Sequence, residues 1–195
     1  QDAVGDSASP ARLPTVAGNR APDIEIKAAK YPAAREFVNS SGFINTDKLK
    51  LADLVGKKIV LLDFWTYSCI NCVRTIPYLN AWWQKYKDKG LVIVGVHTPE
   101  FEFEKSYDNV AAAVKKFGIQ YPVVMDNDYA TWQAYQNQYW PREYLVDIDG
   151  FIIHDHIGEG GYDETERMIQ VALAERMVAL GMQGNIGTAL TAPPA

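Results

Sequence analysis

The only two cysteines of this 195-residue chain, Cys69 and Cys72, are separated by two residues in the stretch DFWTYSCINCVRTIP, residues 63–77. A disulfide across two residues closes so small a loop that it restrains the unfolded chain very little, so a purely stabilising bridge is a weak interpretation. A structural zinc site needs about four ligands, and without a second cysteine pair these thiols would supply only half of one. The spacing therefore favours a dithiol that cycles between its reduced and oxidised forms, with metal binding as the alternative.

The elements around the pair would place its two thiols differently. The apolar, β-branched run KIVLLDFW, residues 58–65, predicts a buried strand that ends just before the cysteines. Residues 70–88 predict an amphipathic helix, because apolar side chains recur at spacings of three and four: Val73, Ile76, Leu79, Trp83 and Tyr86. Backbone N–H groups and the dipole at a helix N-terminus favour negative charge and lower a thiol pKa. We therefore expect Cys69 to be the attacking thiolate and Cys72, a turn further along, to resolve the mixed disulfide.

The rest of the chain alternates strand patterns with helix patterns. Strands are predicted at residues 91–97, 121–126, 142–148 and 151–157, the last two joined as a hairpin by Asp149-Gly150. Helices are predicted at residues 104–118, 129–139 and 162–180. Upstream, residues 35–57 predict a pair of short strands around Gly42 and then a turn of helix. This order predicts an α/β fold with a central mixed β-sheet flanked by helices, in which the first strands are parallel and the last two antiparallel.

Length and composition fit one globular domain. The hydrophobic and charged fractions, 48% and 22%, are ordinary, and the length matches a domain of about 100–200 residues with elaborations. The net charge of −5 gives no electrostatic reason to expect nucleic acid, and no apolar run approaches the ~20 residues of a membrane span. Small, polar and Pro residues predict a flexible leader over residues 1–20 and a flexible tail over 183–195, with the domain at 21–182.

The stretch DFWTYSCINCVRTIP resembles the active site of thioredoxins along its whole length. That pattern has an acid six residues before the first cysteine, a Trp four before it and a Pro five after the second, and Asp63, Trp65 and Pro77 hold these positions. The segment YWPREYLVDIDG, residues 139–150, resembles the part of thioredoxins in which a cis-proline faces the dithiol, and Pro141 holds that place. The resemblance implies a thioredoxin fold and a cis peptide bond before Pro141.

Further segments narrow this resemblance. The upstream strand pair, VGVHTPE and the central insertion EKSYDNVAAAVKKFGIQYPVVMD resemble the TlpA/ResA-like extracytoplasmic thioredoxins. The chain is similar to the thioredoxin domain of DipZ-type thiol-disulfide interchange proteins over about residues 22–175. The segments that carry this similarity are WTYSCINC, GVHTPEFEFEK and YATWQAYQNQYWPREYLVD. The resemblance implies an extracytoplasmic location, protein disulfides or dithiols as substrates, and a membrane electron donor of the CcdA/DsbD type as a partner. It implies no organic cofactor and no metal, because the dithiol itself carries the electrons.

Two acids compete to accept the proton of the resolving thiol. Asp63 lies in an apolar strand, where burial would raise the pKa of its carboxyl and suit it to take a proton from Cys72. The alternative is a strand-end Asp with ordinary hydrogen-bond partners. Glu100 follows the strand at 91–97 and matches an acid near the dithiol of ResA-like proteins, with an ordinary loop charge as the alternative. We expect Asp63 to have the more strongly raised pKa, because Glu100 lies beyond Pro99 in a wetter loop.

Four aromatic or proline residues are candidates for contact with a substrate. Trp65 and Tyr67 flank the cysteines, and core packing is the alternative for each ring. Trp140 and Pro141 would shape a groove in which backbone groups pair with an extended substrate peptide.

The three histidines are weaker candidates. His97 ends a buried strand and is expected to be structural. His154 and His156 alternate along a hairpin strand, so they would share one face, which is more simply an exposed strand face than a metal site. The sequence thus predicts a thiol-disulfide oxidoreductase that acts as a reductant in an extracytoplasmic pathway. Copper delivery through the two cysteines and a histidine, or a non-catalytic interaction module on a thioredoxin fold, remain the alternatives.

Overall fold

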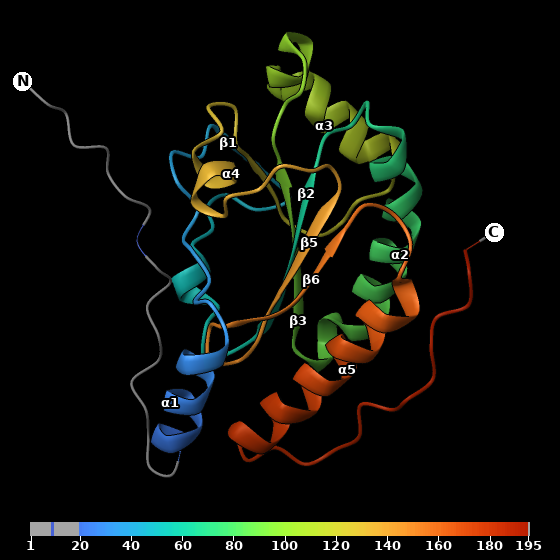
Figure 1. Ribbon diagram of the computed structural model, residues 1–195. Helices are drawn as coiled ribbons and strands as arrows, with labels where there is room; N and C mark the ends of the chain where they lie inside the picture. Colours follow the sequence, from blue (N-terminus) through green and yellow to red (C-terminus); the bar gives the residue numbers. More distant parts are fainter. Residues whose placement is uncertain (1–8, 10–19, 195) are drawn as a thin grey trace, which may run out of the picture.

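A six-stranded sheet forms the centre of the protein, in the spatial order β1-β4-β3-β2-β5-β6 (Figure 1). The computed structural model describes residue 9 and residues 20–194, so the leader predicted for residues 1–20 lies almost wholly outside the described residues. The strands are β1 Gly42–Ile44, β2 Ile59–Trp65, β3 Leu91–His97, β4 Val123–Met125, β5 Arg142–Val146 and β6 Ile152–Ile157. The strand β3 is parallel to β2 and β4, whereas β5 is antiparallel to β2 and β6. The predicted mixed sheet is confirmed.

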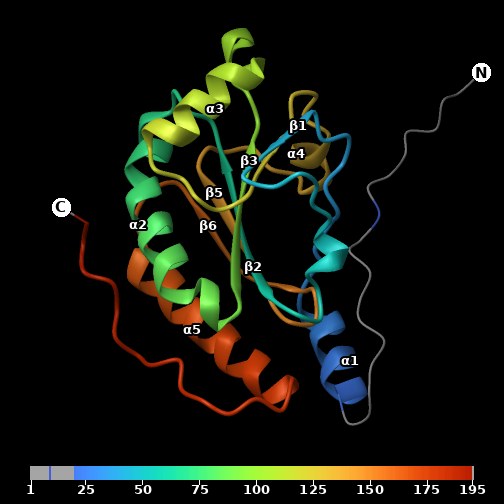
Figure 2. The ribbon, with the colours of Figure 1, turned by 180° about the vertical axis from the view of Figure 1, so that it is seen from behind.

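Helices cover both faces of this sheet, as Figure 1 and the reverse view in Figure 2 show. They are α1 Ala21–Lys30, α2 Ile70–Tyr86, α3 Tyr107–Lys116, α4 Ala130–Ala134 and α5 Tyr162–Ala179, with short 3-10 turns η2 Leu51–Asp53, η3 Lys87–Lys89 and η4 Glu102–Lys105. Apolar side chains of α2, α3 and α5 pack on one face of the sheet, and those of α4 and η2 pack on the other. The predicted α/β architecture is therefore confirmed.

The central strand β2 is buried on both of its faces. Ile59, Leu61 and Trp65 face the core under α2 and α5. Val60, Leu62 and Phe64 face the core under α4, as follows from the alternation of side chains along a strand. Asp63 falls on the α2 side of this alternation, so the sequence places a carboxyl in the middle of an apolar core. That position decides its chemistry.

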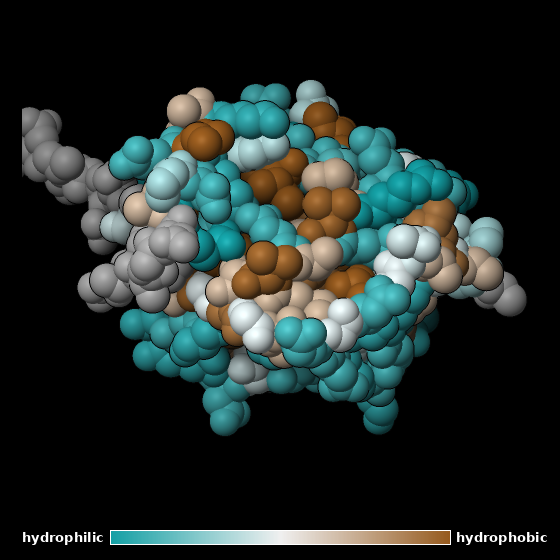
Figure 3. Space-filling model, turned by 90° about the horizontal axis from the view of Figure 1, so that it is seen from below, coloured by the Kyte–Doolittle hydropathy of each residue, from teal (hydrophilic) through white to brown (hydrophobic). Residues whose placement is uncertain are grey.

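The two ends of the sheet differ in character. The strand β2 ends and α2 begins at the upper end in Figure 1, which brings the two cysteines there. At the lower end lie the ends of α1 and α5, and the view from below shows apolar side chains gathered near its middle (Figure 3). Exposed large apolar residues toward the end of α1 and around the end of α5 are Ile26, Val178, Leu180 and Met182. The two cysteines and this apolar surface therefore lie at opposite ends of the molecule.

The prediction of a pair of short strands around Gly42 is wrong, because only one of them forms in the described part of the chain. One strand, β1, forms there and pairs antiparallel with β4, with Gly42 opposite Met125. The segment before it does not pair with β1, because its backbone groups bond elsewhere. The N–H of Val38 donates to the Thr131 hydroxyl at 2.9 Å, and that of Arg35 donates to the Tyr135 hydroxyl at 3.1 Å. Side chains of the α4 region thus take the hydrogen bonds that a second strand would have needed.

The helix α1 was not predicted from the sequence. None of its residues is buried, so packing of an apolar face against the core does not hold it. Its Lys27 ammonium instead lies 2.7 Å from the Asp147 carboxylate and 2.6 Å from that of Asp149, in the turn between β5 and β6. Contacts between charges far apart in the sequence hold this helix.

The buried face of α2 differs from the prediction by one residue. Trp82 is its buried tryptophan, whereas Trp83, which was predicted to face the core, is only half-buried.

The segment after α5 forms no helix or strand up to residue 194, yet it contacts the helices beside it. The Thr191 N–H donates to Glu166 at 2.7 Å, and the Ala189 carbonyl accepts from Lys85 at 2.6 Å and from Gln170 at 2.9 Å. Flexibility of residues 183–195 stays a prediction. Among the helices described, none combines the length and the apolar character needed to cross a membrane.

Candidate active site

Cys69 occupies the N-cap of α2, directly after the loop that leaves β2. Its sulfur accepts a hydrogen bond from the Cys72 N–H at 3.4 Å, which is the usual role of a capping side chain. Hydrogen bonds from the Cys72 thiol, and from the backbone N–H groups of Cys72 and Asn71, lower the pKa of Cys69 to about 6. Partial burial and the negative charge of Glu100 oppose that shift without cancelling it. At neutral pH this half-exposed sulfur is therefore mainly a thiolate.

Cys72 differs sharply from its neighbour. It is 1% exposed, and burial, the hydrogen bond it gives to Cys69 and the charge of Asp63 all raise its pKa. Both cysteines are free thiols in this structure. One accessible thiolate and one buried thiol, a helical turn apart, form a pair that can attack a disulfide and then close on itself.

Asp63 is buried beneath this pair. Burial first, and then the charges of Glu143 and Cys69, raise the pKa of its carboxyl well above the ordinary value. Its Oδ1 has no hydrogen-bond partner among the described residues. A carboxyl in this state can accept a proton from a neighbouring thiol at a pH closer to neutrality than an exposed Asp would.

Glu143 was missed by the sequence analysis. It lies on β5 directly opposite Asp63 and is 2% exposed. Burial raises its pKa to about 8, although the nearby hydroxyl of Thr165 favours the charged form. The signal was present in REYLVDI, where strand alternation puts Glu143 on the same face as the buried Leu145. A charged residue at an inward position of a strand is the pattern that would have found it.

Glu100, the second predicted acid, lies at the surface. Its backbone N–H donates to the carboxylate of Glu104 at 2.7 Å, and Glu104 is the fully buried acid of this loop. Burial opposes ionisation of Glu104, but hydrogen bonds from the Ser68 hydroxyl and from the backbone of Phe101 and Glu100 outweigh it and lower its pKa. Since Ser68 immediately precedes Cys69, Glu104 fixes the loop that carries the nucleophile. The sequence analysis did not single out Glu104.

The peptide bond between Trp140 and Pro141 is cis, as predicted. The Cys69 sulfur lies 3.9 Å from the Trp140 carbonyl oxygen, so this loop faces the dithiol. The Trp140 indole N–H donates to the Thr98 carbonyl at 3.0 Å, which fixes the half-buried ring. Pro141 itself is buried. The loop thus brings the Trp140 carbonyl close to Cys69.

The two aromatic residues before the cysteines lie at different depths. Tyr67 is half-buried, stacks on the His97 ring at 5.7 Å and donates from its hydroxyl to the Phe103 carbonyl at 3.3 Å. Trp65 is 1% exposed and packs edge-on against His97. This burial argues against the direct substrate contact predicted for Trp65, which supports the site from beneath.

The histidines do not converge with the cysteines. His97 is buried, burial lowers its pKa to about 4, and its Nε2 accepts from the Tyr67 N–H at 3.3 Å. His154 and His156 are both half-buried toward α5, with His154 Nε2 3.2 Å from the Thr165 hydroxyl.

One cluster of potential metal ligands stands out among the described residues. It consists of Asp147, Asp149 and Glu175, and it contains no cysteine or histidine. The Lys27 ammonium contacts all three carboxylates, so a basic side chain of the protein already pairs with the cluster.

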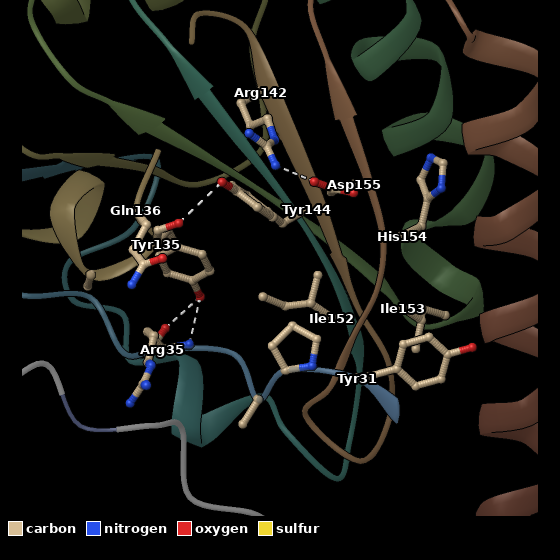
Figure 4. Close-up of a pocket in the computed structure, with 13 residues that line it drawn as sticks. Tyr31, Arg35, Tyr135, Gln136, Arg142, Tyr144, Ile152, Ile153, His154 and Asp155 are labelled. Atoms are coloured by element: carbon tan, nitrogen blue, oxygen red, sulfur yellow. Dashed lines mark hydrogen bonds and ion pairs between the residues drawn. The ribbon is translucent and has the colours of Figure 1, made fainter. Parts of the chain in front are cut away.

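A cavity of about 850 Å³ lies away from the cysteines, between β5, β6 and residues 31–35 (Figure 4). Arg142 and Asp155 form an ion pair on its wall, and the Tyr135 hydroxyl donates to the Arg35 carbonyl at 2.6 Å. None of the residues predicted for the redox site lines it. This cavity is therefore separate from the cysteine pair.

Comparisons with known proteins agree with this geometry. The AhpC/TSA family pattern matches residues 17–155. The chain is 50% identical over 135 residues to Protein DipZ of Mycobacterium tuberculosis, covering 68% of this chain and 19% of that protein. It is 33% identical over 132 residues to thiol-disulfide oxidoreductase ResA of Bacillus cereus, covering 66% of this chain and 73% of ResA. The chain thus spans about a fifth of DipZ but most of ResA.

Solved structures show the same fold. A thioredoxin-like protein whose solution structure is known in its oxidised form superposes with a TM-score of 0.63 at 30% sequence identity. The superposition covers 69% of this chain and 90% of that one.

Proposed function

The chain belongs to the thioredoxin-like AhpC/TSA family, and we propose that it exchanges a Cys69/Cys72 dithiol-disulfide with protein partners. The enzyme class, a thiol-disulfide oxidoreductase, follows from the family and from relatives such as ResA. The observation that carries the proposed roles is the asymmetry of the two thiols. Cys69 is accessible with a lowered pKa, and Cys72 is buried with a raised one. The resemblance to TlpA/ResA-like thioredoxins inferred from the sequence is confirmed by these relatives.

The reaction begins at Cys69. Its thiolate attacks one sulfur of a partner disulfide, which forms a Cys69-to-partner disulfide and expels the other partner sulfur as a thiolate that takes a proton from water. Cys72 then transfers its proton to Asp63, and the Cys72 thiolate attacks the Cys69 sulfur. The Cys69/Cys72 disulfide forms, and the second partner thiolate leaves. Two electrons have passed from the dithiol to the partner, and the reverse sequence oxidises a partner dithiol.

Asp63 suits the role of proton acceptor better than Glu100. Asp63 is buried, and its charge is among the influences that raise the pKa of Cys72, so the two groups lie close enough to interact. Glu100 is exposed, and its charge opposes ionisation of Cys69 instead. Trp140 and Pro141 would offer backbone groups to an extended substrate peptide beside Cys69, with Tyr67 as the opposite wall.

The direction of electron flow and the location are part of the proposal. We infer a reductant in an extracytoplasmic pathway, supplied by a membrane electron donor of the CcdA/DsbD type. The similarity to DipZ and ResA supports this inference. Equilibration of the dithiol with glutathione tests the direction, because a potential near ~ −270 mV fits a reductant and one near ~ −120 mV fits an oxidant.

Exchange with a fluorescent peptide that carries a disulfide tests the function itself. Reduced protein should release the fluorophore with the loss of both thiols, and dithiothreitol should restore them. Purified protein that holds copper and has inert thiols would favour metal delivery. Inert thiols without metal would favour a non-catalytic interaction module. Among the described residues, the group of three potential metal ligands contains no cysteine, so it offers no support for copper delivery through Cys69 and Cys72.

A further inference from the structure

Two buried carboxyls face each other beneath the dithiol, and the reaction described above uses only one of them. Asp63 on β2 and Glu143 on β5 are paired residues of an antiparallel ladder. Side chains so paired have Cβ atoms about 4.5–5.5 Å apart. Asp63 is 1% exposed and Glu143 is 2% exposed. One oxygen of each, Asp63 Oδ1 and Glu143 Oε1, has no hydrogen-bond partner in the described part of the protein.

Nothing nearby neutralises this pair. Among the described residues, no lysine, arginine or histidine forms an ion pair with either carboxyl. The neighbouring titratable groups are Cys69 and Cys72 of the dithiol and Tyr121 from the loop before β4. Burial together with the two acids raises the pKa of Tyr121. His156 on β6 is opposite Glu143 in the ladder, but its Nε2 lies 3.5 Å from the Glu159 carbonyl.

Two negative charges at this separation in a dry site cannot both form near neutral pH. Like charges and burial each favour the protonated forms, so such a pair titrates as a unit that retains one proton while the other is lost. The α5 side offers a route outward. The Thr165 hydroxyl lies beside Glu143 and also 3.2 Å from Nε2 of His154, which is half-buried.

We propose that Glu143 is a positioning residue for the resolving step, which holds a proton in common with Asp63 and thereby sets the pH at which Asp63 can accept the proton of Cys72. This inference rests on the proposed function. The Cys72 S–H gives its proton to the Asp63 carboxylate, and the Cys72 thiolate attacks the Cys69 sulfur of the mixed disulfide. The partner thiolate leaves, and the surplus proton of the carboxyl pair passes through the Thr165 hydroxyl and the His154 imidazole to solvent.

Glu143→Gln keeps the shape of the side chain and removes its charge. The mixed disulfide would be formed first, and its resolution then followed by stopped-flow fluorescence across the pH range. The rising limb of the rate against pH should move to lower pH by about one unit or more, because an ionised Glu143 can no longer keep the shared proton on Asp63. At the foot of the wild-type curve the variant should resolve about tenfold faster. Glu143→Asp keeps a carboxyl and should restore a profile close to that of the wild type.

Glu166→Gln is the matched control, because Glu166 is also a buried acid but bonds to Lys85 and Tyr86 at the C-terminal end of α2, away from the cysteines. It should leave the midpoint of the profile unchanged. Superposable profiles for wild type and Glu143→Gln would overturn the inference while leaving the exchange reaction intact. An equal shift in Glu166→Gln would also overturn it, since the effect would then be general.

Infrared titration of the protonated carboxyl band gives a readout that does not depend on activity. Wild-type protein should lose this band in two separated steps, and Glu143→Gln in one step. Two independent carboxyls with overlapping midpoints in the wild type would overturn the inference, even if the Gln variant failed to fold. If wild-type protein exchanged no disulfide at all, the proposed function would fail and the resolving role of Glu143 with it.

Discussion

Replacing Cys72 by Ala should weaken Cys69 as a nucleophile, although Cys72 is not the attacking residue. The hydrogen bond from the Cys72 thiol is the largest influence that lowers the pKa of Cys69. Alanine removes this donor. The backbone N–H groups of residues 71 and 72, which also stabilise the thiolate, would remain. The Cys69 pKa should therefore rise above its wild-type value of about 6 without returning to that of a free thiol.

The size of the rise follows from the strength of one hydrogen bond to a charge. Such bonds contribute about 1.5–3 kcal/mol, and one pKa unit corresponds to about 1.4 kcal/mol. Cys69 is half-exposed, so water replaces part of the lost bond and the lower end applies. We expect the midpoint to move up by about one unit in Cys72→Ala. Cys72→Ser is the matched control, because its hydroxyl can still donate and should keep the midpoint within a few tenths of the wild-type value.

The assay is the rate of alkylation of Cys69 by iodoacetamide against pH, followed by intact mass. Both variants have a single thiol, so every adduct reports on Cys69. Midway between the two midpoints, Cys72→Ala should react about threefold more slowly than Cys72→Ser, as the thiolate fractions require. Identical midpoints in the two variants would show that the Cys72 side chain does not stabilise the thiolate. A midpoint near that of a free thiol in both would refute the whole account of Cys69.

Three further predictions follow from the same geometry. Cys69→Ser should abolish exchange, whereas Cys72→Ser should attack once and accumulate a mixed disulfide visible by intact mass, and the opposite pattern would reverse the roles. In stopped-flow measurements, Asp63→Asn should slow the resolving step about 10–100-fold, and Glu100→Gln should slow it less. A larger loss of rate in Glu100→Gln would make Glu100 the proton acceptor. The folded-state pKa values of Asp63 and Glu143 are raised, so the folded protein retains protons that the unfolded chain has already lost. The free energy of unfolding should therefore fall as pH rises from about 4 toward the folded pKa of Glu143, about 8. Urea unfolding at about pH 5 and about pH 8 measures this difference in the free energy of unfolding, which should be smaller in Asp63→Asn than in wild type. The variant should be no less stable than wild type at the higher pH. An unchanged difference would contradict the raised pKa of Asp63.

Local patterns were enough to predict most of the sheet. The run KIVLLDFW became β2, and Asp149-Gly150 marked the turn between β5 and β6. The error around Gly42 has a different origin. The strand β1 pairs with β4, which lies about eighty residues further along the chain, and no local pattern specifies such a partner. The helix α1 was missed for a related reason, because ion pairs with the β5–β6 turn hold it.

The site was predictable where a residue's role is local to the chain. The position of Cys69 at a helix start, and the cis bond before Pro141, both follow from short segments around them. Glu104 and Glu143 were not found, because each acts through a contact made in space. Glu104 reaches back 36 positions to Ser68, and Glu143 meets Asp63 only through strand pairing. Polar residues at such buried positions can be identified only when the pairing of the strands is known.

Burial alone does not decide what the acids near the dithiol do. Glu104 is 0% exposed and Asp63 is 1% exposed, so neither side chain contacts bulk water, although Asp63 lies deeper in the core. Their pKa values nevertheless move in opposite directions. Glu104 accepts hydrogen bonds from Ser68 and from the backbone of Glu100 and Phe101, which replace the lost water and fix it as an anion.

Asp63 receives no such replacement for water and faces a second acid, so its charged form is costly. A permanently charged carboxylate can hold a loop, but it cannot take up a proton near neutral pH. A poorly solvated one can do so, because its two protonation states are close in free energy. The supply of hydrogen bonds thus separates the acid that positions Cys69 from the acids that serve Cys72. Giving Asp63 a new donor should therefore convert it from a proton acceptor into a structural anion.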